Sequence, residues 1–214
     1  MRNRSEQQWL ALWQRLGAQG DAGAVYNDLV TRYSEPHRAY HTLAHIGYCL
    51  NEFEQARHLA INPDAVELAL WYHDAIYDTK AKDSEERSAA LVVEMARNTL
   101  LPDTLGQSVA NLIMATKHTS APADLDVQLL VDIDLSILGQ SEEKFDEYER
   151  QIRKEYDWVY EDQFVAGRSA ILKSFLDRPN IYTTQAFRDK YEAQARRNII
   201  RSLAQLLSRQ HRIS

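Results

Sequence analysis

Residues 70–78, LWYHDAIYD, place ionisable side chains inside an apolar segment. The apolar residues have the spacing of a buried helix, yet His73 and Asp74 stand side by side in the middle, and Asp78 follows one helical turn after Asp74. Buried ionisable groups are costly unless they are paired, hydrogen-bonded or bound to a metal. The stretch therefore predicts partners that come from elsewhere in the chain.

Composition bounds the class of protein. The chain has 214 residues, of which 44% are hydrophobic and 26% charged, with a net charge of -6 and a pI near 5.7. This composition suits a soluble protein with a filled core and argues against binding to a nucleic-acid polymer, which favours a basic surface. The single cysteine, Cys49, excludes an intrachain disulfide and fits a small core residue. We see neither a signal peptide nor a membrane-spanning run, so we expect a cytoplasmic protein without a membrane partner.

Hydrophobic spacing predicts an all-α fold. Only 7 glycines and 5 prolines interrupt the chain, and apolar residues recur at helical intervals throughout. Without an evident linker, we expect one domain over 1–214, with N-terminal helices in 1–34 and a C-terminal helical extension in 141–214. The amphipathic first helix packs either on this domain or on a second copy, so a homodimer is an open alternative. The expected helices cover residues 9–16, 25–33, 40–59, 62–78, 85–100, 102–118, 123–139, 141–160, 164–176 and 185–207.

Histidines and aspartates recur on separate predicted helices. His41 and His45 are four residues apart, so on a helix they would share one face. Asp132 and Asp134 lie in the apolar run LLVDIDLSIL. Residues two apart on a helix point about 200° around from each other, so only one of these aspartates faces a given site.

Together with the His73–Asp74 pair, these residues form a mixed nitrogen and oxygen donor set. Such a set suits a divalent transition metal rather than calcium, and the scarcity of cysteine argues against a structural zinc site. Each signal also has a plainer interpretation. A lone histidine on an apolar face is more often a core residue, a pair spaced by four arises by chance, and an aspartate can be a solvated or capping group.

The order His45, then His73–Asp74, then Asp134 resembles the HD superfamily of metal-dependent phosphohydrolases. The segments EPHRAYHTLAHI, WYHDAIYD, SEERSA, DIDLSILG and EAQARRNI are similar to a bacterial family of predicted HD phosphohydrolases, from about Tyr33 to the C-terminal helix. The resemblance implies an all-helical HD bundle with the metal between helices. It implies one or two divalent ions (Mn, Fe, Co, Ni, Zn or Mg), held by His45, His73, Asp74 and Asp134. Asp134 is preferred to Asp132 because DLSIL follows the pattern of other HD ligands.

The segment YHTLAH is also similar to the YHNxxH segment of cyclic-nucleotide phosphodiesterases. That likeness implies that His45 binds the metal and that His41 is the general acid. Thr42 replaces the asparagine of the segment, and the histidine that follows the HD pair in those enzymes is absent. A cyclic nucleotide is therefore not implied as the substrate.

The expected function is hydrolysis of a phosphate ester or anhydride, a nucleotide first of all, by a metal-activated water. Asp78 shares a predicted helix face with Asp74. Asp78 and Glu85 are both catalytic candidates, either as ligands of a second metal or as groups that position water. Glu85 has a plainer interpretation as a carboxylate favoured at a helix N-terminus. The substrate could equally be a dinucleotide, an alarmone or another phosphate ester.

A phosphorylated substrate needs local cations in this acidic chain. The candidates are Arg38 beside the YHTLAH segment, Lys117 and His118 at a predicted helix end, and Arg168 among apolar residues. Lys117 and His118 could instead complement a helix dipole, and Arg168 could be a buried ion-pair partner, for example of Glu155 or Glu192.

Two alternatives to an enzyme stay open. A catalytically silent HD-type sensor could hold metal and nucleotide without turnover. A plain helical scaffold could use the polar cluster for structure alone.

Overall fold

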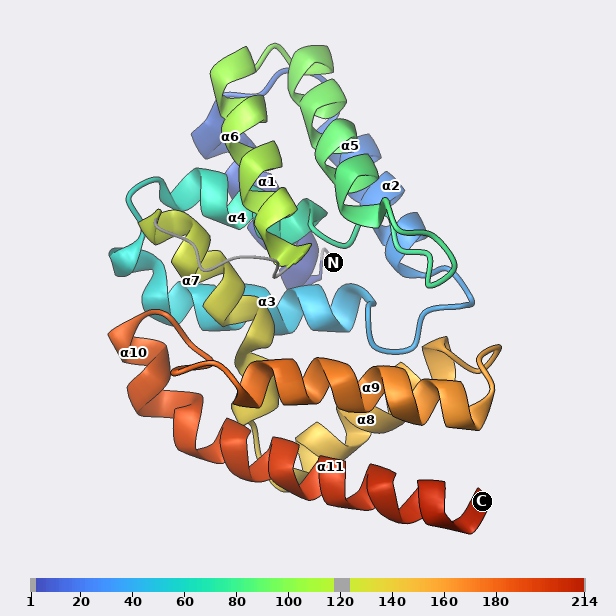
Figure 1. Ribbon diagram of the computed structural model, residues 1–214. Helices are drawn as coiled ribbons and strands as arrows, with labels where there is room; N and C mark the ends of the chain where they lie inside the picture. Colours follow the sequence, from blue (N-terminus) through green and yellow to red (C-terminus); the bar gives the residue numbers. More distant parts are fainter. Residues whose placement is uncertain (1–2, 118–123, 214) are drawn as a thin grey trace. The chain divides into compact units, whose positions relative to one another are not determined.

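The computed structural model describes residues 3–117 and 124–213, and in these residues the chain forms helices and no strand, as predicted (Figure 1). The chain divides into two compact units, residues 1–131 and 132–214. The division falls inside helix α7, Leu125–Asp134, so no linker separates the units in sequence. The expectation of a single domain stays a prediction.

The first unit contains most of the predicted site. Its helix α4, Pro63–Tyr72, begins at a recognisable capping residue: the Asn62 side chain accepts a hydrogen bond from Ala65 N at 3.3 Å, and Pro63 occupies the first helical position. Besides the start of α7, its helices are α1 Arg4–Leu16, α2 Ala22–Tyr33, α3 Leu43–Ala56, η1 Arg57–Leu59, α4 Pro63–Tyr72, α5 Ser84–Asn98, α6 Asp103–Met114 and η2 Ala115–Lys117.

Helix α4 is the centre of the first unit. It packs against α1, α3, α5 and α6, and α5 and α6 lie side by side (Figure 1). Trp71 on α4 meets the Trp9 ring edge-on, with ring centroids 5.5 Å apart, and both side chains are buried. Arg15 on α1 forms ion pairs with Asp64 at 2.8 Å and with Glu67 at 2.5 Å. The N-terminal helices therefore form part of the core around α4.

The second unit is organised by a buried carboxylate and an amide. Asp132 accepts hydrogen bonds from the backbone N–H and the hydroxyl of both Thr183 and Thr184, at 2.7–3.0 Å. Asn198 donates to the Leu138 carbonyl at 2.9 Å. Helix α11 packs against α9. The elements are the end of α7, η3 Leu135–Gly139, α8 Glu142–Glu155, α9 Glu161–Leu176, α10 Gln185–Phe187, the π-helix η4 Arg188–Glu192 and α11 Ala193–Ile213.

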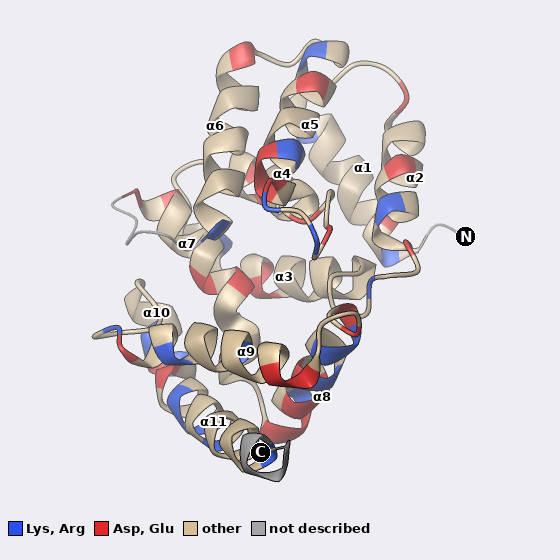
Figure 2. Ribbon diagram, turned by 45° about the vertical axis from the view of Figure 1, so that its right-hand side comes forward, with Lys and Arg blue, Asp and Glu red and all other residues tan. Residues whose placement is uncertain are grey.

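Charged side chains of both signs are mixed along α8 (Figure 2). Within the described residues, none of the helices has both the length and the apolar character needed to cross a bilayer.

Candidate metal centre

Three donor side chains meet in the first unit. His45 lies in the first turn of α3, and His73 and Asp74 lie directly after the last residue of α4. The Nε2 atoms of His45 and His73 are 3.2 Å apart. Asp74 Oδ2 is 3.1 Å from His73 Nε2 and 3.4 Å from His45 Nε2. Packing of α3 against α4 thus brings together residues separated by 28 positions.

The backbone fixes which nitrogen of His73 carries its proton. Nδ1 lies 3.0 Å from the Leu70 carbonyl oxygen, which can only accept a hydrogen bond. Nδ1 is therefore the donor, and in the neutral ring Nε2 presents a lone pair to Asp74 and His45. Metal-binding histidines commonly donate their other ring N–H to a carbonyl in this way.

Asp74 Oδ2 is buried, and the polar atoms that face it within the described residues are Nε2 of His73 and Nε2 of His45. Burial raises the pKa of this carboxyl, but positive charge on His73 and His41 outweighs burial and holds the pKa well below its usual value. The carboxylate is therefore charged at neutral pH. A protonated His73 can donate from Nε2 to this oxygen 3.1 Å away. If His73 is neutral, its Nε2 lone pair and the carboxylate repel each other, and a cation between them would replace the missing proton.

The spacing of the three atoms fits a bound cation. Nitrogen or oxygen ligands about 2.1 Å from a metal, at angles of 90–109°, are about 3.0–3.4 Å apart. The observed separations of 3.1, 3.2 and 3.4 Å fall within this range. Atoms so arranged lie about 1.9 Å from the centre of their triangle, so one ion at about 2.1 Å can touch all three. The cluster is thus compatible with three ligands on one face of a metal.

Cys49 is a neighbour that the sequence did not assign to the site. It follows His45 by one turn of α3, and its sulfur joins ligand atoms of His45 and His73 that all lie within 4.8 Å of one another. The sulfur is 3.6 Å from Nε2 and 3.7 Å from Nδ1 of His45, so it lies along the lone pair of neither nitrogen. The spacing of four residues between His45 and Cys49 was the sequence signal that could have assigned the cysteine to the site.

The two aspartates of DIDLSILG belong to the second unit. The four hydrogen bonds from Thr183 and Thr184 occupy the Asp132 carboxylate, which therefore holds the segment before α10. Asp134 is the last residue of α7 and is half-buried. Its role as the fourth ligand stays a prediction.

His41 does not share a helix face with His45, which corrects the sequence prediction. Helix α3 begins only at Leu43, because Thr42 is its N-cap and its hydroxyl accepts a hydrogen bond from Ala44 N at 3.3 Å. His41 nevertheless lies beside the cluster, with its ring centroid 5.9 Å from that of His45 and 4.0 Å from the stacked Tyr77 ring.

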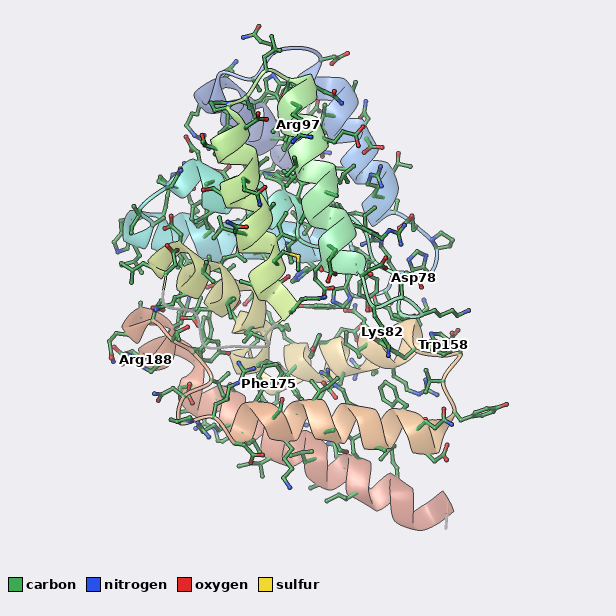
Figure 3. The ribbon with its side chains drawn as sticks, turned by 45° about the horizontal axis from the view of Figure 1, so that its top comes forward. Asp78, Lys82, Arg97, Trp158, Phe175 and Arg188 are labelled. Carbon is green, nitrogen blue, oxygen red and sulfur yellow. The ribbon has the colours of Figure 1, made fainter. Side chains whose placement is uncertain are left out.

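Asp78 is not one helical turn after Asp74, because α4 ends at Tyr72. It lies in the loop between α4 and α5, together with Lys82 (Figure 3). It is exposed, and its carboxylate accepts a hydrogen bond from Lys80 N at 2.9 Å, as in a local turn. Glu85 lies in the first turn of α5, where the helix dipole favours a carboxylate.

The predicted substrate-binding cations lie in different surroundings. Arg168 is buried in the second unit and pairs with Glu149, neither of the partners that the sequence suggested. This placement agrees with the buried ion-pair interpretation, and the expected contact of Arg168 with substrate stays a prediction. Lys117 pairs with Glu86 at the surface. His118 lies outside the described residues.

Arg38 is also buried, with a side chain 0% exposed. Its guanidinium donates to the carboxylate of Glu35 and to three backbone carbonyls. Four of its N–H groups are thus already engaged, and the expected phosphate-binding role of Arg38 stays a prediction.

Two serines of the SEERSA segment hold the loop that carries Asp74. Ser88 Oγ accepts a hydrogen bond from Ile76 N at 3.0 Å and donates to the Ile76 carbonyl at 3.3 Å. Ser84 Oγ accepts from Asp78 N at 3.2 Å. The SEERSA segment, already singled out in the sequence, forms the start of α5. That helix places both serines against the loop.

No protein-family model matches this chain, and neither a curated protein nor a solved structure matches it.

Proposed function

We propose that this protein is a metal-dependent phosphohydrolase that uses a divalent cation held by His45, His73 and Asp74. One observation carries the proposal: two imidazole nitrogens and a buried carboxylate oxygen lie 3.1–3.4 Å from one another. The separations are those of neighbouring ligands around one cation, and a cation would remove the repulsion between the donor lone pairs.

The donor types narrow the choice of metal. Two imidazoles and a carboxylate suit Mn, Fe, Co, Ni or Zn, and Mg is a weaker fit because it prefers oxygen ligands. Asp134 enters the proposal as a fourth ligand through the order of the sequence motifs. The substrate class rests on the resemblance of these motifs to those of HD phosphohydrolases. That resemblance favours a nucleotide or another phosphate ester or anhydride.

A divalent ion bound here would lower the pKa of a coordinated water and polarise a phosphoryl oxygen. His41 is the proposed proton donor. It stacks on Tyr77 beside the cluster and is half-buried, so its ring is oriented while it keeps access to solvent. In the proposed reaction, His41 gives a proton to the leaving oxygen as the bond to phosphorus breaks.

The test combines elemental analysis with a substrate screen. Purified protein should carry, or take up, at least one equivalent of Mn²⁺, Co²⁺, Ni²⁺ or Zn²⁺. It should then release phosphate or pyrophosphate from members of a nucleotide panel. His73→Ala and Asp74→Ala should lose both metal and turnover. The matched control is His58→Ala, which removes an exposed histidine on η1 and should change neither.

Three other outcomes would contradict the proposal. Turnover by His73→Ala equal to the parent would remove the catalytic assignment. Tight binding of metal and nucleotide without product over long incubation would identify a sensor. Protein that takes up no divalent ion and is unaffected by chelator would leave only the scaffold interpretation.

A further inference from the structure

Arg38 has an unusual set of partners for a buried arginine. Nε donates to the Glu35 carboxylate at 3.0 Å. One terminal nitrogen donates to the carbonyls of His41, at 3.0 Å, and Asp74, at 2.7 Å. The other donates to the Ala75 carbonyl at 3.1 Å. Four of the five N–H groups of the guanidinium are thereby used, three of them on backbone.

These carbonyls belong to two segments far apart in the sequence. One segment precedes α3 and contains His41, and the other follows α4 and contains Asp74. Neither segment is helical at these residues, so their geometry is not fixed by a helical hydrogen-bond ladder. The rigid, planar guanidinium joins them directly.

The same cation also organises the aromatic rings beside the cluster. Its central carbon lies 5.1 Å from the ring centroid of Tyr33 and 5.6 Å from that of Tyr77. Tyr77 in turn stacks on His41. Arg38 therefore contacts the backbone of His41 and the ring on which the His41 imidazole rests.

We infer that Arg38 is a positioning residue that sets His41 against the Asp74 carboxylate. The inference rests on the proposed function, in which Asp74 binds the cation and His41 donates the proton. Groups that orient metal ligands commonly change metal affinity or activity about 10–100-fold when they are removed. A substrate-binding arginine would instead affect KM.

The test compares Arg38→Lys with the parent, because lysine keeps the charge and loses the planar fork. Co²⁺ affinity of each metal-free protein is measured by calorimetry, and kcat and KM are measured with p-nitrophenyl phosphate. The expected result is a 10-fold or greater loss of Co²⁺ affinity, and a 10-fold or greater loss of kcat with KM unchanged.

The matched control is Arg57→Lys. Arg57 also pairs with carboxylates, Asp64 and Glu67, and lies over an aromatic ring, Phe53, at 5.2 Å. The control should lose thermal stability but keep the parent's Co²⁺ affinity, which separates positioning from general destabilisation. If Arg38→Lys does not fold, Glu35→Gln replaces it. That variant weakens one of the four hydrogen bonds, and we expect a smaller, 2- to 5-fold loss of affinity.

The outcomes separate the two proposals. Failure of the parent to bind Co²⁺ overturns the proposed function and this inference with it. Parent binding with unchanged affinity and kcat in Arg38→Lys, or with unchanged affinity in Glu35→Gln, overturns the inference alone. A raised KM with unchanged kcat also overturns it and restores Arg38 as a substrate-binding residue. If the parent does not hydrolyse p-nitrophenyl phosphate, the Co²⁺ measurement decides.

Discussion

Gly139→Ala should destabilise the second unit, because the chain passes very close to another segment at this residue. Gly139 ends η3 and faces Tyr191 of the π-helix η4. A Cβ at this position would lie 2.6 Å from Tyr191 Cβ and 2.8 Å from the Tyr191 carbonyl oxygen. Neither atom is the far end of a flexible side chain, so the backbone itself must move.

The size of the effect follows from the missing space. Carbon atoms pack best at about 3.5–4.0 Å, so the two segments must separate by about 1 Å. Overpacking of this kind costs about 1–3 kcal/mol, and the rigidity of both atoms places Gly139→Ala at about 3 kcal/mol. For a chain of this length, such a loss lowers Tm by about 6–12 °C.

Urea unfolding followed by circular dichroism measures the change. The matched control is Gly167→Ala in the interior of α9, where an added Cβ meets no atom within 4 Å. Alanine has a higher helix propensity than glycine, so this variant should gain about 0.5–1 kcal/mol. A Gly139→Ala protein as stable as the parent would refute the reasoning from contact distances.

Four further predictions follow from the described geometry. Leu100 has φ of 58° at the end of α5 and is 78% exposed, so Leu100→Gly should raise stability by about 1 kcal/mol in thermal melts. Asp132→Ala leaves the donors of two threonines without their acceptor, and urea unfolding should show a loss of about 3 kcal/mol or more. His41→Ala should retain Co²⁺ but lose about 10²–10⁴ in rate, with a larger loss for phenyl phosphate than for p-nitrophenyl phosphate; loss of Co²⁺ instead would make His41 a ligand. Protons compete with a cation for the cluster imidazoles, so calorimetry should show weaker Mn²⁺ binding at pH 5.5 than at pH 7.5; equal affinities would exclude imidazole ligands.

The helices could be predicted from the sequence where local chemistry decides their ends. Asn62 and Pro63 have side chains suited to a helix start, and α4 begins there. The helix expected over 141–160 likewise starts at Ser141, which is the N-cap residue of α8. The all-α class was confirmed because helical periodicity is a property of the chain alone.

The end of α4 could not be predicted in the same way. No glycine or proline follows Tyr72 closely, and the apolar spacing continues to Ile76. Contacts from distant residues hold the non-helical turn instead: Arg38 binds two of its carbonyls, and Ser88 binds the backbone of Ile76. These contacts depend on tertiary structure.

For the site, the sequence predicted which residues matter better than how they are arranged. His45, His73 and Asp74 were expected to share a metal, and their donor atoms lie within 3.4 Å of one another. Arg38 was predicted to bind phosphate because a cation near such a cluster suggests an anion. Three of its four hydrogen bonds go to backbone carbonyls, which leave no residue-specific mark in a sequence.

The distribution of tryptophans makes the two units distinguishable by intrinsic fluorescence. Three of the four indoles, Trp9, Trp13 and Trp71, are buried in the first unit, and Trp158 is 48% exposed in the second. Fluorescence emission from the three buried tryptophans should shift to longer wavelength only when the first unit unfolds. Trp158 already contacts water in the folded state. A fluorescence melt therefore reports mainly on the unit that carries His45, His73 and Asp74.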